Sequence, residues 1–449
     1  MDATARSGLA TSLSADDLGT RKAFRRLMWF LFILLVVSFF DRINIAFASL
    51  TMNKELGLTA AMYGLSLTVF YAGYFLFEIP SNLALARYGA RLWIARIMIT
   101  WGIASAGTMF AVGAWSLYGW RLATGIAEAG FLPGILLYLT YWFPRSYRAR
   151  ANSLFLIGIP STVAISSVVS GYILQMDGFL GLSGWRWLFL LEGLPAVILG
   201  IACFFYLDDG PAKAKWLSIE EKAALQKRLE QDHAEETLGA AKRTILSQLG
   251  SRNVVLLSAA YFGLVSSLNT NTTWTPQIVR EFAAGASFHS LGWLAATPAI
   301  ITVGAMVLWG RSSDRRNERP WHIRIAMLTA AVGWLLVVFA ILPELRYLGL
   351  ILVSCGSFCG LLTFWTLPAS TAILSPDARP AGIALINCVG IGGGSALTPA
   401  VVGILKDWSG SFLPGLLFVV VMLCISMICI TLVATHQRAI AAAAEAARA

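Results

Sequence analysis

Residues 27–50 read LMWFLFILLVVSFFDRINIAFASL. The first half of this stretch is almost wholly apolar, and since about 20 such residues cross a bilayer as a helix, it is predicted to be the first membrane span. Inside it stand an acid, a base and an amide: Asp41, Arg42 and Asn44. Charged side chains are costly within a bilayer and usually face a bundle interior or an aqueous cavity, so Asp41 and Arg42 are predicted to belong to a functional site. The alternative is a buried structural ion pair between helices.

The composition of the whole chain points the same way. Its 449 residues are 57% hydrophobic and only 13% charged, whereas soluble proteins carry about 25% charged residues. This excludes an ordinary soluble protein and predicts a polytopic membrane protein whose surroundings are the lipid bilayer. The net charge of +10 is therefore not taken as a sign of nucleic-acid binding, and no nucleic acid is expected as a partner.

Apolar runs long enough to span a bilayer recur along the chain. They predict an all-α protein with twelve membrane-spanning helices in two halves of six. The expected spans are 27–50, 62–86, 92–112, 116–142, 151–174, 186–207, 252–276, 289–309, 323–342, 346–374, 381–405 and 413–434.

The segment 208–251 differs from every other link. Ser218 is a good helix cap, and a mixed-charge run follows it, so a soluble amphipathic helix is expected between the halves. The predicted organisation has a cytoplasmic tail, a first half, a cytoplasmic linker, a second half and a second cytoplasmic tail. Their ranges are 1–26, 27–207, 208–251, 252–434 and 435–449.

Most lysines and arginines fall in the two tails, the linker and the loops on the same side of the predicted membrane. The positive-inside rule places that side, with both termini, in the cytoplasm. The expected location is the cytoplasmic (inner) membrane of a bacterium. Two six-helix halves are typical of carriers that bind substrate between repeats, and a functional monomer is expected.

Two short basic loops occupy corresponding positions in the halves, GRSSDRRNER (310–319) and NLALARYGAR (82–91). In the first of them, Asp314 could cap a neighbouring helix start and pair with an arginine, latching the cytoplasmic side. Gly310, Asp314 and Arg315 are therefore predicted gating residues. The alternative is an ordinary basic turn.

The layout and the G-x-x-x-D-R-R pattern resemble the major facilitator superfamily. Within it, four stretches are similar to the anion:cation symporter family, and the similarity covers nearly the whole chain. The stretches are FDRINIA (40–46), GYFLFEIPSN (73–82), RLATGIAEAGFLPG (121–134) and ALINCVG (384–390). One departure is Ala86, where the superfamily usually has an acid, so the latch of the first half is expected to be weaker.

The fourth predicted span carries Arg121 and Glu128, seven positions and about 10 Å apart on nearly one helix face. Asp41 lies about 22 Å into the first span counted from Arg26, which is a depth similar to that of Arg121. The hypothesis is that Asp41 and Arg121 pair in one state of a transport cycle and separate when Asp41 takes up a proton.

Glu128 stands among glycines and alanines, where backbones can approach closely. It is predicted to carry a proton, and the resemblance implies the same; the alternative is a fixed hydrogen bond between helices. Arg42 is the predicted clamp for a substrate carboxylate, with Arg121 as a second contact, because a guanidinium matches a carboxylate in shape and charge. The alternative for Arg42 is an internal partner, Glu128 or Asp41.

Further candidates lie around these charges. Tyr74 is a predicted hydroxyl donor beside the site. Tyr71, one turn away, either lines the site or packs, and Glu78 is expected to be structural or gating. In the second half Trp365 could form the opposite wall, and the resemblance implies substrate binding by Asn387.

Asn271 belongs to a polar cluster at 269–273 that either sets specificity or caps the outer end of its helix. It is retained as a predicted substrate-binding residue.

These features predict a proton-coupled symporter that imports a small organic anion by alternating access: a sugar acid, a hydroxy-dicarboxylate such as tartrate, or an aromatic carboxylate. An organic-anion exchanger and a sodium-coupled carrier are the alternatives; a non-transporting receptor or a membrane-embedded enzyme is more remote. The sequence has no HExxH motif, P-loop or Cys/His metal cluster, so no enzyme activity, metal or cofactor is expected.

Overall fold

The computed structural model describes residues 15–238, 250–316, 318–368, 373–374 and 379–446. In these ranges, twelve helices are long and apolar enough to cross a membrane, which confirms the number expected from the sequence. No strand occurs in the described residues. The chain is an all-α membrane protein.

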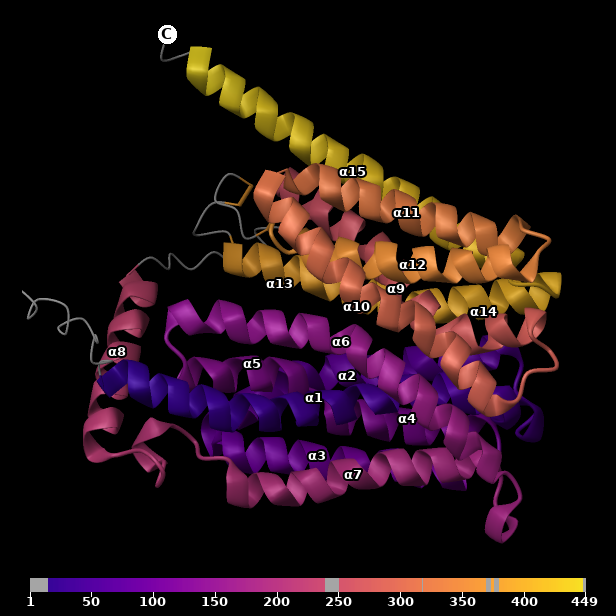
Figure 1. Cartoon of the computed structure of the whole chain (residues 1–449), viewed down its shortest axis with the longest axis horizontal. Helices are drawn as coiled ribbons and strands as arrows, with labels where there is room; N and C mark the ends of the chain where they lie inside the picture. Colours follow the sequence, from indigo (N-terminus) through magenta and orange to yellow (C-terminus); the bar gives the residue numbers. More distant parts are fainter. Residues whose placement is uncertain (1–14, 239–249, 317, 369–372, 375–378, 447–449) are drawn as a thin grey trace, which may run out of the picture.

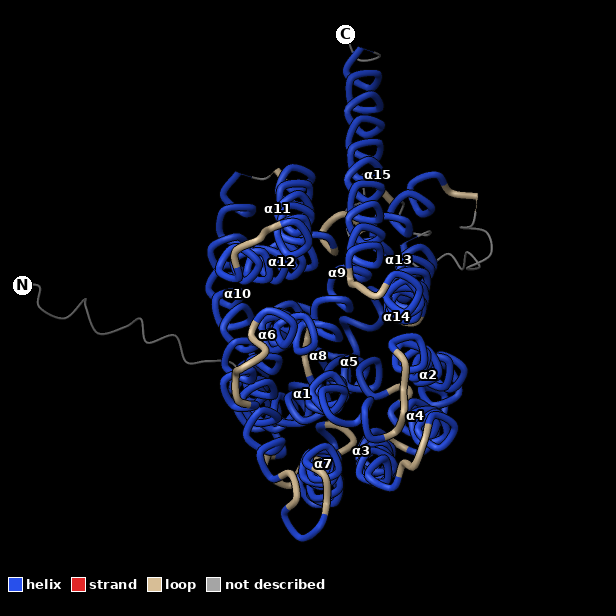
Figure 2. The backbone as a smooth tube through the Cα atoms, turned by 90° about the vertical axis from the view of Figure 1, so that its right-hand side faces the viewer, coloured by secondary structure: helices blue, strands red, loops and turns tan. Residues whose placement is uncertain are grey.

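The helices form two groups that follow each other in the chain (Figures 1 and 2). The first group meets the second mainly where α6 packs on α10 and α2 packs on α14. The first group contains α1 (Ala15–Glu55), α2 (Ala60–Tyr88), α3 (Ala90–Gly107), α4 (Ala114–Glu128), α5 (Phe131–Trp142), α6 (Arg145–Ile173) and α7 (Gly184–Tyr206), with 3₁₀ turns at Thr108–Phe110, Leu174–Met176 and Phe179–Gly181. After another 3₁₀ turn (Pro211–Lys213) and α8 (Ile219–Leu238), the second group contains α9 (Arg252–Phe282), α10 (Phe288–Arg316), α11 (Arg319–Phe339), α12 (Pro343–Phe364), α13 (Arg379–Val389), η6 (Gly390–Ser395), α14 (Leu397–Ser409) and α15 (Leu413–Ala446).

The fourth span is broken, although the sequence predicted one helix over 116–142. α4 ends at Glu128, and α5 begins at Phe131. Between them Gly130 has φ +82°, a left-handed conformation that side chains disfavour. A Cβ at Gly130 would also lie 2.6 Å from the Ser81 hydroxyl oxygen. The break therefore places Glu128 at a helix end, next to irregular backbone.

The eleventh span is also interrupted, by the π-helical segment η6 between α13 and α14. Its glycines lie against aromatic rings of α9: a Cβ on Gly390 would overlap Tyr261, and one on Gly393 would overlap Phe262. Only glycine permits this approach. Segments of π-helix often occur at functional sites, and η6 contributes Ser395 to the cavity described below.

The expected linker helix is α8, and its first turn has the predicted cap. The Glu221 amide donates to the Ser218 hydroxyl at 3.2 Å, and the Ser218 amide donates to the Glu221 carboxylate at 3.0 Å. This reciprocal pair is a capping box. Lys22 also donates to Glu221 at 2.6 Å, which fastens α8 to the start of α1.

Both predicted tails are partly helical. Within 1–26, residues 15–26 are the first turns of α1, because they pack against α8. Within 435–449, residues 435–446 continue α15, which projects from the bundle toward the C-terminus (Figure 1).

The end of the bundle at which α8 lies is called the linker side below, and the opposite end the far side. The hydrogen bonds between the two halves whose partners are both described lie between the middle of the bundle and the far side. These bonds join Ser49 to Gln277, Ala60 and Ala61 to Asp407, Tyr63 to Thr273, Thr68 to Ala396, Tyr71 to Asn269, and Gln175 to His289. In this structure, then, the halves are closed against each other on the far side.

Candidate functional site

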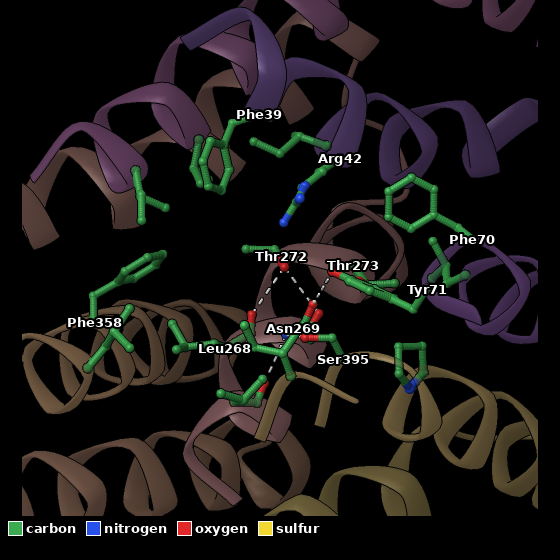
Figure 3. A pocket seen from close by; sticks show the side chains of 18 of the residues that line it. Phe39, Arg42, Phe70, Tyr71, Leu268, Asn269, Thr272, Thr273, Phe358 and Ser395 are labelled. Atoms are coloured by element: carbon green, nitrogen blue, oxygen red, sulfur yellow. Dashed lines mark hydrogen bonds between the residues drawn. The ribbon is translucent and has the colours of Figure 1, made fainter. Parts of the chain in front are cut away.

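A cavity of about 170 Å³ lies between the two halves (Figure 3). It is smaller than the ~300–1,000 Å³ typical of sites for drug-sized molecules, so it suits a small ligand. Apolar and aromatic side chains form most of its wall. The wall residues with hydrogen-bonding side chains are Arg42, Tyr71, Arg121, Tyr261, Asn269, Thr272, Thr273 and Ser395.

Arg42 reaches the cavity from α1, and Glu128 lies behind it. The guanidinium donates to one carboxylate oxygen of Glu128 from Nε at 3.1 Å and from Nη2 at 2.6 Å. The other carboxylate oxygen of Glu128 is buried without a hydrogen-bond partner. The ring of Tyr74 lies 5.5 Å from the Arg42 guanidinium carbon, so Tyr74 touches the predicted clamp although it does not line the cavity.

Small residues bring Glu128 into this position. A Cβ on Gly125 would overlap the Phe70 carbonyl oxygen, and one on Gly73 would lie 2.9 Å from the Leu122 carbonyl oxygen. The two glycines allow the backbones of α2 and α4 to pack closely. Since α4 ends at Glu128, its carboxylate faces α1 from the last helical position.

Asp41 points away from Arg42, as expected for adjacent positions on a helix, which differ by about 100°. Trp101 donates to one carboxylate oxygen of Asp41 at 3.0 Å. Asn44 donates to the other at 3.1 Å, and Ser105 donates to the same oxygen. Asp41 is thus held between α1 and α3, and in this structure it makes no ion pair with Arg121, the partner hypothesised for one state of the cycle.

Arg121 is the second cation in the cavity wall. Its side chain is fully buried, its guanidinium carbon lies 4.4 Å from the centre of the Phe70 ring, and its Nε has no hydrogen-bond partner. It interacts electrostatically with Asp41 and Glu128, but among the described residues no acid is close enough to form an ion pair with it. A buried guanidinium without an ion-pair partner favours the binding of an anion.

The second half contributes neutral polar groups from α9. Asn269 and Thr272 line the cavity, and Figure 3 shows them across from Arg42. Asn271, the predicted residue of this cluster, lies instead in a separate small pocket, where its side-chain oxygen accepts from Thr275 at 3.1 Å. The helical period places Val265, Asn269 and Thr272 on one face of α9, but it does not show which face of the helix lines the cavity.

Two other predicted residues do not line this cavity. Trp365 packs edge-on against Tyr261 at 4.9 Å, and Tyr261 is the ring that forms the wall. Asn387 is half-buried on α13, on the linker side of η6. Glu78 lies one turn beyond Tyr74 on α2 and is also half-buried outside the cavity wall.

The predicted gating loop forms a local contact. The Asp314 carboxylate pairs at 2.9 Å with Arg319, the first residue of α11, and its side chain is 69% exposed. Gly310 packs against Leu362 of α12, and Arg315 is exposed. The pair joins α10 to the helix that follows it, and both belong to the second half.

The corresponding loop of the first half has Ala86 in place of an acid, but Asp209, which follows α7, binds the backbone at this loop. Asp209 accepts a hydrogen bond at 3.1 Å from the amide of Arg91, in the first turn of α3. A carboxylate at a helix start is favourable because the helix dipole is positive there. Asp209 thus caps α3 within the first half.

Residues 31–284 match the family model described as Major Facilitator Superfamily. The chain belongs to the major facilitator superfamily. A relative from Agrobacterium vitis named "Putative tartrate transporter" is 45% identical over 93% of this chain and 95% of its own. The "Quinolone resistance transporter" of Acinetobacter baumannii is 36% identical over 89% of this chain and 91% of its own.

A solved structure has the same fold. The xylose transporter XylE from E. coli, in a partially occluded inward-open conformation, matches with a TM-score of 0.70 at 13% identity, covering 91% of this chain and 97% of that one. This likeness shows the fold; the family match and the relatives above show that the chain is a transporter of the major facilitator type. In this major facilitator protein the charged groups of the site come from the first half, and the cavity wall of the second half offers neutral donors and acceptors.

Proposed function

We propose that the transporter carries a small organic anion together with protons. The observation that supports this most is the pair of Arg42 with Glu128 at the cavity wall, because the acid occupies the cation that a substrate carboxylate would need. A proton on Glu128 weakens the pair and frees Arg42. The substrate carboxylate then takes the place of Glu128, so that proton and anion bind together.

The charges of the site support coupling to protons. Asp41 and Glu128 balance Arg42 and Arg121, so the empty site is neutral when all four are ionised. An anion that enters adds uncompensated charge in a setting of low dielectric, where charge is costly. Protons on the two acids restore neutrality, and two of them would offset a dianion.

The proposed substrate class is a small hydroxy-dicarboxylate such as tartrate. One support is the name of the relative from Agrobacterium vitis. Two others are the small cavity and its two arginines, each of which can receive one carboxylate. The cavity also has neutral hydrogen-bonding groups for hydroxyls, namely Asn269, Thr272 and Thr273.

We also propose that the linker side faces the cytoplasm of a bacterium and that the transporter works as a monomer in the inner membrane. The support for the orientation is the concentration of lysine and arginine in the linker and the loops on that side. With the far side closed, the structure then corresponds to a state that opens inward.

The test is uptake of labelled tartrate by purified protein in proteoliposomes, with an imposed proton gradient. We expect uptake to exceed equilibration and to be lost when a protonophore collapses the gradient. The variant Glu128→Gln should lose gradient-driven accumulation but keep exchange of tartrate across the membrane, because a neutral side chain at 128 leaves Arg42 permanently available.

Glu192→Gln is the matched control. Glu192 is an equally buried acid, but its carboxylate binds Ser170 at 2.7 Å and lies outside the cavity wall. This variant should keep coupled uptake. Tartrate uptake that ignores the proton gradient and follows sodium instead would contradict the proposed coupling, and a lack of any tartrate flux would contradict the substrate class.

A further inference from the structure

Asn269 belongs to the half of the protein that contributes no charged side chain to the cavity wall. It lies in the wall contributed by the second half, whereas Arg42 reaches the cavity from the first half (Figure 3). A ligand that fills the cavity therefore touches Arg42 with one end and can touch Asn269 with another. The chemistry that Asn269 offers decides what that second group can be.

The hydrogen bonds of Asn269 fix which side-chain atom faces the ligand. Its amide nitrogen donates to the Val265 carbonyl at 3.1 Å and to the Ser395 hydroxyl at 2.8 Å. A backbone carbonyl can only accept, so the NH₂ group must be the atom that faces Val265. Both amide hydrogens are then used, and Asn269 has no donor left for a ligand.

The side-chain oxygen of Asn269 keeps acceptor capacity. Its described partner is the Tyr71 hydroxyl at 3.3 Å, which is longer than the usual ~2.7–2.8 Å of an O–H···O bond. A carbonyl oxygen has two lone pairs, so a second donor can bind beside Tyr71 or replace it. A ligand hydroxyl can fill this role, whereas a carboxylate cannot, because it has no hydrogen to donate.

We propose that Asn269 recognises a hydroxyl group of the substrate and thereby makes the carrier prefer a hydroxy acid over the same acid without its hydroxyls. The carboxylate binds the arginines of the first half, and the hydroxyl donates to Asn269 in the second half. This proposal rests on the proposed function and deepens it by naming the residue that selects within the substrate class.

Tyr71 connects this recognition to the closed far side. It belongs to α2, so its bond to Asn269 is one of the contacts that join the two halves. A hydroxyl that displaces Tyr71 from Asn269 removes one of these contacts, whereas an acid without hydroxyls leaves it in place. The hydroxylated substrate therefore favours separation of the halves on the far side more than its counterpart does.

The experiment measures how unlabelled tartrate and succinate inhibit exchange of labelled tartrate in proteoliposomes. Succinate has the same carbon chain and both carboxylates but no hydroxyls. In the wild type we expect tartrate to be preferred by roughly two- to tenfold for a hydrogen bond of ordinary strength. In Asn269→Ala the ratio of the succinate to the tartrate inhibition constant should fall toward one, because tartrate inhibits more weakly while inhibition by succinate changes little.

Two further variants serve as controls. Asn271→Ala removes the same kind of side chain two positions away, in the separate small pocket where its oxygen accepts from Thr275, so the preference should not change. Tyr71→Phe removes the competing donor but leaves the acceptor, so the preference for tartrate should stay or rise. This second variant tests the proposal even where Asn269→Ala does not fold.

The outcomes separate the two proposals. If Asn269→Ala weakens inhibition by tartrate and inhibition by succinate by the same factor, Asn269 is only structural, and the inference is overturned. It is also overturned if Tyr71→Phe abolishes the preference, because Tyr71 would then be the residue that senses the hydroxyl. A wild-type protein that transports both acids alike refutes this inference alone, and one that transports neither refutes the proposed function with it.

Discussion

One of the contacts that close the far side of the transporter can be removed with a single substitution. The carboxylate of Asp407, on α14, accepts hydrogen bonds from the amides of Ala60 at 2.9 Å and Ala61 at 2.8 Å. These amides begin α2, so an acid of the second half caps a helix of the first half. The cap exists only while the two halves touch, and its loss therefore favours separation.

The magnitude follows from the geometry. A carboxylate at an exposed helix start is worth about 1 kcal/mol, and up to about 2 kcal/mol with two good bonds. Asp407→Asn removes the charge and one of the two acceptor oxygens, so we expect a loss of about 1 kcal/mol. That changes the ratio of the separated to the closed far side about fivefold.

Hydrogen exchange followed by mass spectrometry can measure this change. Amides at the contact exchange mainly when the halves separate, so peptides from the start of α2 and from α14 should exchange about fivefold faster in the variant. A peptide that contains Gln277 must accelerate as well, because Gln277 donates to Ser49 across the same interface but does not touch Asp407. Acceleration at α2 alone would mean local fraying.

Asp209→Asn is the matched control, since Asp209 caps α3 within one half at 3.1 Å. It should speed exchange at the start of α3 and leave the far side unchanged. The reasoning is refuted if Asp407→Asn leaves the peptides of α14 and Gln277 at the wild-type rate, or if Asp209→Asn accelerates them equally.

Three further predictions concern other parts of the chain. Asp41→Asn should abolish proton-driven uptake of tartrate in proteoliposomes but spare exchange, and an Asn variant that still concentrates substrate against a gradient would contradict this. Gly130→Ala should lower the thermal unfolding midpoint more than Gly57→Ala does: both glycines have positive φ, worth about 1–2 kcal/mol, but only at Gly130 would the new Cβ also collide with a neighbouring hydroxyl. The hydrogen bond from Lys22 holds the pKa of Glu221 below its ordinary value of 4.5, so the contribution of this carboxylate to α8 docking is full above that pH and is lost as pH falls further. Glu221→Gln should therefore speed hydrogen exchange in α8 at pH 7 by an amount that corresponds to no more than ~1 kcal/mol, because the Lys22 side chain of this pair is about half exposed. In strong acid the variant should not differ from the wild type, and an equal effect at both pH values would exclude the ionic contribution.

The spans could be predicted because each needs a long apolar run, and such runs are visible in the sequence. The interruptions could not be placed in the same way. Gly130 breaks the fourth span through its backbone conformation, and η6 exists because aromatic rings of α9 fill the space beside its glycines. Hydropathy does not register either cause.

The candidate site was predictable to the extent that it is charged. Arg42 and Glu128 drew attention because ions within a span need partners, and the structure pairs them. Neutral polar residues gave no comparable signal: Asn269 and Asn271 are two positions apart, and only the orientation of α9 decides which of them lines the cavity. The sequence alone could not supply that orientation.

The position of Asp41 and Arg42 has a consequence for how the protein is made. The partners of both residues, Trp101 and Ser105 for the acid and Glu128 for the base, are synthesised only after α1. An Asp and an Arg near a span centre oppose insertion by about 2.5–3.5 kcal/mol each, and the apolar run before them returns about 0.3–0.6 kcal/mol per Leu, Ile, Phe or Val. The free energy of inserting the first span on its own is thus close to zero. The span becomes stably inserted in the membrane once α3 and α4 emerge beside it.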